Sequence, residues 1–568
     1  MQYKKLAQLY EDLSSTTKRL EKIEILSKFL KFLPKEDRDV MYLLEGMIYP
    51  EYDDRKIGIS NQLAIKAISK ATGISPDKVT KEWKTIGDLG EVAKKLFQNK
   101  KQSTLHSYIL TTEKVIENLR KLPELVGKGT VNKKLALITE LMTSASPIEA
   151  QYLTRTVIGD LRIGVQEGTI RESMSAAFFD RDKQASEAIQ KAIDKANDLA
   201  IVFDIARKGK LKGLEKVSLE IGKPIKAMLA QKATSFKEGF EKVGSPCAVE
   251  YKYDGFRLII HKKGKEVFLF TRMLENVTKQ FPEVVECILK HVKGNSFILD
   301  SETVGFDKKT KEYTDFQAIS QRIRRKYDIE KLQEKLPVEV NVFDILYYNG
   351  KSLLEKPFEE RSKLLRKILT EKKYKILASK QLITDDEKKA DKFYKKALAD
   401  NQEGVMMKNL KSDYRPGRRV GNMVKMKPEE RDLDLVITGA EYGTGKRSGW
   451  LSSFILSCRG KKKDEYFEIG KVGTGIAEKD NEITFDSLTK LLTPLITSEK
   501  GKIAKIKPKI VVSVTYQEVQ RSPNYKSGWA LRFPRFTALR PDKPLKEIAD
   551  PKEIEEAFKN QKRNWRFG

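Results

Sequence analysis

The stretch Glu250-Tyr-Lys-Tyr-Asp-Gly-Phe-Arg257 decides how the rest of the chain is interpreted. Its first residues predict a β-strand, and Asp254-Gly255 predicts a turn directly after it. Lys252 stands just before this turn, and a lysine there can act as a nucleophile once it loses its proton. Desolvation together with nearby cations or a metal would favour the neutral amine. A lysine chosen at random is far more often solvated, so Lys252 is a candidate only because of the motifs that accompany it.

The charge balance indicates a polyanion as partner. The 568 residues include 110 Lys plus Arg and 80 Asp plus Glu, which gives a net charge of +30, and nucleic acid is the first candidate for such a protein. A membrane surface is the second. However, no run approaches the roughly 20 apolar residues of a spanning helix, and the start at Met1 does not resemble a signal peptide. We therefore expect a cytoplasmic protein.

Two further features of the composition bound the class of protein. The three cysteines, Cys247, Cys287 and Cys458, are widely separated, and the three histidines form no pair with them at metal-ligand spacing. The sequence therefore predicts neither a zinc site nor a disulfide framework. Charged residues make up 33% of the chain with Lys and Glu dominant, a bias reported for hyperthermophile proteins, so we expect a thermostable protein.

The length predicts several domains, because one hydrophobic core stops growing at about 250 to 300 residues. Apolar residues at three- and four-residue steps predict an all-α domain over residues 1–220. Period-two runs alternating with helical segments predict an α+β domain over residues 221–428. Short strands between Gly-rich turns predict a small β-barrel over residues 429–568, with a helical tail.

Capping signals place helix boundaries in the first third. Thr17 precedes a helical run that Pro34 follows, and Ser75-Pro76-Asp77 predicts another helix start. The segments Gly87-Asp-Leu-Gly90 and Gly159-Asp-Leu-Arg-Ile-Gly164 interrupt the helical pattern. Their backbone N–H groups could face phosphates, or their glycines could simply end helices.

Five further motifs follow the Lys252 segment, in a fixed order and at plausible spacing. One such motif alone is weak evidence, whereas the ordered set is specific. The five are Phe270-Thr-Arg272, Phe297-Ile-Leu-Asp-Ser-Glu302, Val342-Phe-Asp344, Glu403-Gly-Val-Met-Met-Lys408 and Val424-Lys-Met-Lys427.

Each motif contains a residue with a chemical use and a plainer alternative. Glu302 and Glu403 could converge on a divalent cation, or one could bind ribose hydroxyls; otherwise they are surface glutamates. Phe343 could stack on a base or pack against a neighbouring domain. Lys425 and Lys427 lie on one face of a strand, where two ammonium groups can hold an α-phosphate, although such pairs are often a solvated edge.

The ordered motifs resemble those of the covalent nucleotidyltransferases, and the chain from end to end is similar to the ATP-dependent DNA ligases of archaea and eukaryotes, the archaeal ones above all. The resemblance implies an all-α DNA-binding domain, an adenylation domain and an OB-fold domain, in that order. It implies that Lys252 takes AMP from ATP and passes it to the 5′-phosphate of nicked duplex DNA, after which the 3′-hydroxyl displaces AMP. The implied roles are replication, including the joining of Okazaki fragments, repair and recombination.

The resemblance also implies roles for single residues. Lys252 takes the AMP, and Arg257 and Glu302 hold the ribose side. Phe343 stacks on adenine, while Glu302 and Glu403 serve Mg²⁺, with Mn²⁺ as an alternative. The complete implied nucleotide site is Glu250, Lys252, Arg257, Arg272, Glu302, Phe343, Lys425, Lys427, Arg532 and Arg535.

The remaining implied roles concern phosphate. Arg272 contacts a phosphate group, and Lys425 and Lys427 hold the α-phosphate. Arg532 and Arg535 orient the leaving group of the triphosphate when the C-terminal barrel closes over the site.

Nicked DNA is the implied partner of a monomeric enzyme, and a second partner is a hypothesis. The segment Gln102-Ser-Thr-Leu-His-Ser-Tyr-Ile109 resembles a peptide that binds a sliding clamp. Its matching residues are Gln102, Leu105, Tyr108 and Ile109. An ordinary helix start explains the same segment, because short motifs give many false matches.

Competing functions are distinguished by other parts of the chain. An RNA ligase or mRNA-capping guanylyltransferase would share the lysine motif but not the large helical N-terminal part. An NAD-dependent ligase would be expected to carry a four-cysteine zinc module, which three scattered cysteines cannot supply. A non-catalytic DNA-binding scaffold would explain the charge but would leave the ordered motifs unexplained.

Overall fold

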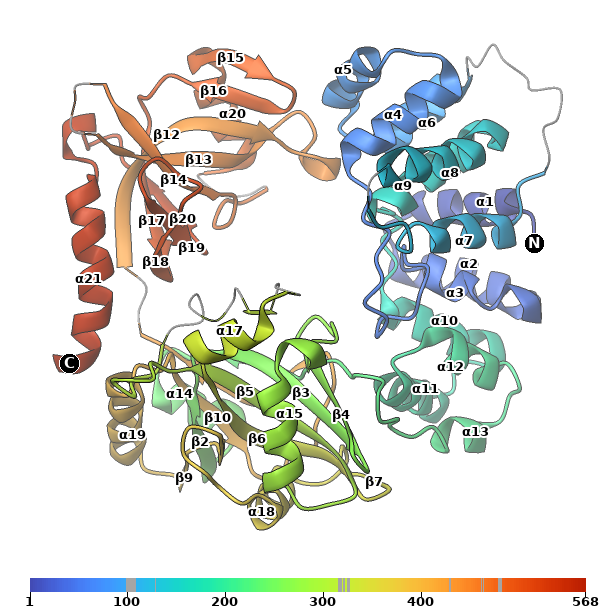
Figure 1. Ribbon diagram of the computed structural model, residues 1–568. Coiled ribbons are helices and arrows are strands. Elements are labelled where there is room, and N and C mark those ends of the chain that lie inside the picture. Colours follow the sequence, from blue (N-terminus) through green and yellow to red (C-terminus); the bar gives the residue numbers. More distant parts are fainter. Residues whose placement is uncertain are drawn as a thin grey trace. The chain divides into compact units, whose positions relative to one another are not determined.

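A computed structural model describes residues 1–98, 109–127, 129–314, 319, 322–323, 327–428, 431–460, 462, 464–478 and 483–567. It divides the chain into two compact units (Figure 1). One unit contains residues 1–14, 57–163 and 429–564, and the other contains residues 15–56 and 164–428 with the last few residues. The sequence ranges 1–220, 221–428 and 429–568 therefore stay a prediction of domain bounds.

The first third of the chain is helical, as predicted. The predicted apolar faces are buried, including Leu6 and Leu13 of the first helix and Leu26 and Leu30 of the second. The helices are α1 (Tyr3–Ser14), α2 (Arg19–Lys31), α3 (Val40–Leu43), α4 (Asn61–Thr72), α5 (Pro76–Ile86), α6 (Leu89–Gln98), α7 (Thr112–Lys121), α8 (Thr130–Ser144), α9 (Pro147–Ile158), α10 (Glu167–Phe178), α11 (Lys183–Ala196), α12 (Leu199–Ala206) and α13 (Leu211–Glu215).

The capping predictions had mixed outcomes. Ser75 is the N-cap of α5, as predicted. The prediction for Thr17 was wrong: Lys18 is the N-cap of α2, and the hydroxyl of Thr16 accepts the Lys18 N–H at 3.1 Å. Gly87 and Gly159 end α5 and α9 at φ +76° and +74°, so both serve as C-cap glycines in the left-handed conformation that glycine adopts without strain.

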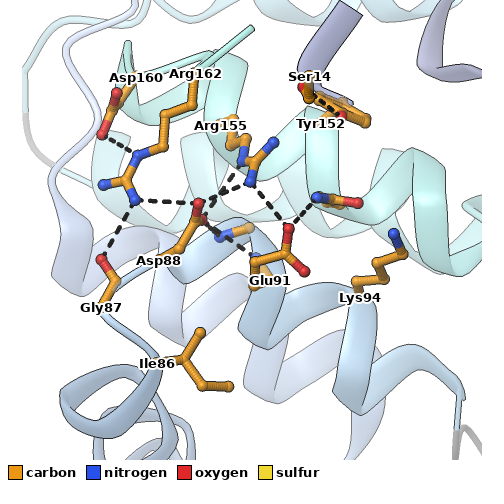
Figure 2. A network of polar contacts seen from close by, with 12 residues as sticks. Ser14, Ile86, Gly87, Asp88, Glu91, Lys94, Tyr152, Arg155, Asp160 and Arg162 are labelled. Carbon is orange, nitrogen blue, oxygen red and sulfur yellow. Dashed lines mark hydrogen bonds and ion pairs between the residues drawn. The ribbon is translucent and has the colours of Figure 1, made fainter. Parts of the chain in front are cut away.

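A buried ionic network ties the segment after α5 to α9 and to the segment after α9 (Figure 2). Asp88 caps α6 by accepting the Gly90 N–H at 2.8 Å, and its other carboxylate oxygen accepts from Arg155 at 2.8 Å and from Arg162 at 3.1 Å. Burial would raise the pKa of Asp88, but Arg155 and Arg162 outweigh burial and lower it. The two glycine-containing segments singled out in the sequence are therefore fixed to each other through one carboxylate.

The middle of the chain forms two sheets that pack through a shared apolar cluster. This cluster includes Met228 and Met423 from the strands and loops of one sheet and Ile259, Ile298 and Leu346 from the other. The five-stranded sheet has the order β1 (Leu229–Lys232), β11 (Arg419–Met426), β10 (Gly404–Asn409), β2 (Cys247–Lys252) and β9 (Gln381–Thr384). The six-stranded sheet has the order β4 (Glu266–Thr271), β3 (Phe256–Lys263), β5 (Ser296–Gly305), β6 (Val338–Tyr348) and β7 (Lys351–Ser352), and β8 (Ile376–Ala378) pairs with β6.

Helices cover the outer faces of these two sheets (Figure 1). Residues of α14 (Phe236–Val243) and α19 (Glu387–Ala399) pack on the five-stranded sheet. Residues of α15 (Pro282–His291) and α18 (Phe358–Ile368) pack on the six-stranded sheet, and α17 (Ile329–Lys335) precedes β6. β3 and β4 form an antiparallel hairpin with Lys263 opposite Glu266.

The C-terminal part is built on a seven-stranded sheet. Its core contains Leu435, Phe454 and Val512 from the strands predicted by period two, together with Phe485 of a helix. The order is β14 (Tyr466–Val472), β13 (Leu451–Arg459), β12 (Arg431–Tyr442), β16 (Ile503–Ile506) and β15 (Ile496–Lys500), with β17 (Val511–Tyr516) between β12 and β20 (Arg535–Leu539). A separate pair is β18 (Glu518–Arg521) with β19 (Trp529–Arg532), and the helices are α20 (Phe485–Leu492) and α21 (Pro551–Phe567).

The sequence predicted neither a disulfide framework nor a membrane-spanning helix. All three cysteines are free and buried. Within the part of the chain that the structure describes, no helix combines the length and apolar character needed to span a membrane.

Asp88→Ala should loosen the contact between α6 and α9. The substitution removes the cap of α6 and leaves the buried Arg155 guanidinium and the half-buried Arg162 guanidinium without their shared carboxylate, a loss of about 3 kcal/mol. Because this loss weakens the packing, the backbone amides of α6 and α9 should exchange hydrogen faster than in the wild type. Asp77→Ala, an exposed change in the first turn of α5, is the matched control. Unchanged protection in the Asp88 variant would show that the network does not stabilise this packing.

Candidate functional site

Lys252 lies where the chain crosses from one sheet to the other. It is the last residue of β2, in the five-stranded sheet, and Phe256 begins β3 in the six-stranded sheet. The crossing requires glycine at position 255, since a Cβ there would lie 2.3 Å from the carbonyl oxygen of Thr303. The sequence prediction of a strand followed by a turn at Asp254-Gly255 is thus confirmed.

Glu403 joins two lysines of the site. Its carboxylate lies 2.5 Å from the Lys252 ammonium and also pairs with the Lys427 ammonium. Its backbone N–H donates to the Lys252 carbonyl at 2.9 Å. Burial would raise the pKa of Glu403, but the two ammonium groups outweigh burial and lower the pKa to about 2. Glu403 therefore stays charged at every physiological pH.

Gly404 makes this position of Glu403 possible. Its φ is +139°, and a Cβ would lie 2.2 Å from the carbonyl oxygen of Met426. The Glu-Gly pair of the sequence motif thus has a structural reason: only glycine lets the chain enter β10 this close to the end of β11.

Glu302 is the second carboxylate near Lys252. It lies in β5 directly opposite Arg257 in β3. Burial raises the pKa of Glu302 to about 8, and the carboxylates of Glu403 and Asp300 act in the same direction, against the cations of Lys252 and Arg257. The two carboxylates predicted to converge are therefore brought to the same lysine, and their pKa values differ widely.

Arg257 is held by residues that the sequence reasoning did not assign. The buried Asp300 carboxylate accepts from its Nε at 2.7 Å and from its Nη2. Nη1 donates to the Met228 carbonyl at 3.2 Å, and the Tyr414 hydroxyl donates to Asp300 at 2.8 Å. Asp300 could have been noticed, because it lies within the Phe297–Glu302 motif. Tyr414 carries no such signal.

Phe343 lies near Arg257 and Lys408, and Glu250 is bound by Lys408 as well. The Phe343 ring centroid is 5.3 Å from the Arg257 guanidinium carbon and 4.6 Å from the Lys408 ammonium. Glu250 forms an ion pair with Lys408 at 2.6 Å and accepts from the Gln381 amide at 2.8 Å. Lys408 and Gln381 were not assigned roles from the sequence, although Lys408 ends one of its motifs.

The remaining predicted residues are more dispersed. Lys425 lies in β11, opposite Met406, and Arg272 is exposed in the turn that follows β4. Arg532, in β19, pairs with Glu518 at 2.9 Å, and Arg535 is exposed in β20. Both arginines belong to the unit that does not contain Lys252.

Most of the predicted clamp-binding segment lies outside the residues that the structure describes. Gln102, Leu105 and Tyr108 lie outside the described residues, whereas Ile109 is described and is 68% exposed.

The acidic residues fit a magnesium site that substrate completes. Among the described residues no group of three or more His, Cys, Asp or Glu side chains could hold a metal. Mg²⁺, however, is usually bound by one or two carboxylates together with water and substrate phosphates. Glu302 and Glu403 supply such a pair, and a cation beside Glu302 would offset the burial that now disfavours its charged form.

Comparison with known proteins finds family models that match most of the chain. Three family models match: "DNA ligase N terminus" over residues 2–175, "ATP dependent DNA ligase domain" over residues 227–427 and "ATP dependent DNA ligase C terminal region" over residues 447–543. A DNA ligase of Nanoarchaeum equitans is 44% identical over 99% of both chains. A DNA ligase of Thermococcus onnurineus is 40% identical over 99% of this chain and 100% of its own.

A solved structure called Pmar-Lig_PreS3 shares the fold. It has a TM-score of 0.58 and 17% sequence identity, and the similarity covers 94% of this chain and 99% of that one.

The three matched models define the class of protein as an ATP-dependent ligase. The full-length identity to archaeal relatives narrows this class: the chain belongs to the ATP-dependent DNA ligase family.

The pKa of Glu302 predicts how cation binding should depend on pH. Because the carboxyl must lose a proton before it binds a cation, Mn²⁺ affinity measured by electron paramagnetic resonance should rise between pH 6 and pH 8 and level off above the pKa of about 8. The slope approaches about tenfold per pH unit. The free energy of unfolding should change in the opposite direction. Because the folded carboxyl keeps its proton to higher pH than the unfolded one, the fold without ligand loses stability as pH rises towards 8.

Two variants check this assignment. Glu302→Gln should bind Mn²⁺ more weakly and with a flat pH profile, while Glu241→Gln, at an exposed glutamate of α14, should behave as the wild type. The same pH slope in Glu302→Gln and the wild type would remove Glu302 from the cation site.

Proposed function

We propose that this protein seals nicks in duplex DNA through a lysyl-AMP intermediate on Lys252, with the nucleotide site assigned above. The observation that carries the proposal is the Lys252–Glu403–Lys427 cluster, which places a lysine amine beside a permanently charged acceptor and a second cation. Positioning and charge neutralisation are what phosphoryl transfer requires of a protein.

In the first step, the Lys252 amine attacks the α-phosphorus of ATP. The amine forms when the Lys252 ammonium releases a proton to solvent, and it makes a nitrogen–phosphorus bond as the bond to the bridging oxygen breaks. Pyrophosphate leaves, and the attacking nitrogen releases a second proton to solvent. Glu403 accepts a hydrogen bond from the amine and orients it, and Lys427 lies beside the same carboxylate. With Lys425, Lys427 neutralises charge on the α-phosphate. Arg272 contacts phosphate, and Arg532 and Arg535 orient the leaving group.

The remainder of the nucleotide is held by the other sheet. Phe343 stacks on adenine, Glu250 accepts from the base edge, and Arg257 and Glu302 face the ribose. Glu302 and Glu403 would hold Mg²⁺, or Mn²⁺ in its place, and the ion would neutralise charge on the phosphate oxygens.

In the two later steps, the DNA 5′-phosphate attacks Lys252-AMP, and the 3′-hydroxyl then displaces AMP to form the phosphodiester bond. The all-α residues 1–220 would bind DNA and residues 221–428 would carry out adenylation. Residues 429–568 would form an OB-fold barrel. Relatives of archaeal origin support a thermostable, monomeric enzyme of the archaeal cytoplasm that acts in replication, repair and recombination. The Gln102–Ile109 segment would then bind a sliding clamp.

Labelling should identify the nucleophile. Wild-type protein incubated with Mg²⁺ and ATP labelled at the α-phosphate should become labelled, and nicked DNA should then remove the label and be sealed. Lys252→Ala should take up no label, because no amine remains at the site. Lys380→Ala, which changes an exposed lysine paired with Asp400, should label normally. Equal labelling of Lys252→Ala would move the nucleophile elsewhere.

DNA binding should be strongly salt-dependent. With at least six phosphate contacts, affinity for nicked duplex should fall about 10³-fold between about 50 and 200 mM salt, as counterions are released. Fluorescence anisotropy with several duplex sequences measures this, and sequence should matter little. Lys252→Ala should keep the wild-type salt slope. A binding constant that does not change with salt would contradict phosphate-dominated binding.

A further inference from the structure

We propose that Lys408 and Gln381 are positioning residues for the donor base. They hold the Glu250 carboxylate as a fixed acceptor and thereby select a donor with a 6-amino group over other purines. The inference rests on the proposed function, because it requires that ATP binds at Glu250 and Phe343. Neither residue is assigned to touch the reacting phosphorus.

Lys408 and Gln381 both bind the carboxylate of Glu250, and they come from the two strands that flank β2. Lys408 lies in β10, diagonal to Glu250 of β2, because Met406 is the residue directly opposite. Its ammonium group is 2.6 Å from Glu250 Oε2. Gln381 lies in β9 directly opposite Glu250, and its amide donates to Oε1 at 2.8 Å. Each carboxylate oxygen therefore has its own donor.

Lys408 also fixes the aromatic ring proposed to stack on the base. Its ammonium group donates to the Phe343 carbonyl at 3.4 Å and lies 4.6 Å from the Phe343 ring centroid, within cation–π range. The buried Lys408 ammonium group thus contacts both Glu250, proposed to accept from the edge of the base, and Phe343, proposed to stack on the face of the base.

Burial indicates that this ion pair does more than stabilise the fold. Lys408 is 6% exposed and Glu250 is 2% exposed. Desolvating two charges roughly cancels their attraction, so apolar residues of similar size would serve stability as well. The pair does, however, hold a carboxylate in one orientation, which an apolar pair could not do.

The chemistry of a fixed carboxylate accounts for selection of the base. An ionised carboxylate only accepts hydrogen bonds, and each oxygen has room for about two. Lys408 and Gln381 use part of this capacity. The 6-amino group of adenine is a donor, whereas a 6-oxo purine presents an acceptor at the same place. Without its two donors, the Glu250 carboxylate would reorient, and its preference for a donor would be lost.

The test compares donors that differ at one position of the base. Self-adenylation of the full chain is measured with ATP, with the triphosphate of unsubstituted purine riboside and with inosine triphosphate. The wild type should favour ATP by about 10- to 100-fold in kcat/KM. Lys408→Met should reduce this preference to about threefold or less, mainly by raising KM for ATP. Lys408→Arg should recover most of it.

Controls separate positioning from folding and from the proposed function. Gln381→Leu, at a half-buried position, should reduce the preference in the same direction and remains informative if Lys408→Met does not fold. Lys380→Met, at the exposed neighbouring lysine, should keep the wild-type preference. Equal losses with all three triphosphates would mean a structural role only and would overturn the inference. If the wild type is not adenylated by ATP at all, the proposed function itself fails.

Discussion

The contact between Glu403 and the two lysines Lys252 and Lys427 is the interaction on which the site depends. It joins the end of β2, the start of β10 and the end of β11, three adjacent strands of one sheet. Without this carboxylate, two ammonium groups would face each other across a partly buried site, where their repulsion is poorly screened. With it, the cluster keeps a net positive charge towards an incoming phosphate. The same contact therefore assembles the sheet end and prepares it for phosphoryl transfer.

A second layer of buried ion pairs fixes the sheet that faces this cluster. Asp300 holds Arg257, and Asp344 holds the buried Arg361, whose Nε lies 2.8 Å from the carboxylate. Neither aspartate is assigned to touch the nucleotide, yet each lies within a sequence motif next to a residue that is. The motifs thus include residues that hold the nucleotide-binding side chains in place as well as those side chains themselves. This is expected of a site whose geometry must be held within a fraction of an ångström.

The sequence predicted most of the local structure, such as helices and turns, but little of the pairing between strands that are far apart in the chain. Apolar periodicity located the helices of the first third, and Asp254-Gly255 located the turn after β2, because these signals depend on neighbouring residues. The order β1-β11-β10-β2-β9 could not be read from periodicity, since strands of similar pattern can pair in many ways. Gln381 and Tyr414 were missed for this reason: each reaches the site from a segment more than 100 residues from the strand it contacts.

The two carboxylates beside Lys252 differ because their partners differ. Glu403 has two direct ammonium partners and a pKa of about 2, whereas Glu302 is buried beside other carboxylates with a pKa of about 8. At neutral pH the ligand-free site therefore holds one permanent anion and one carboxyl that keeps its proton. If Glu302 bound a divalent cation together with the triphosphate, its carboxyl would lose that proton and become a second anion. The protein thus avoids placing two charged carboxylates where phosphates must bind unless the metal is bound as well.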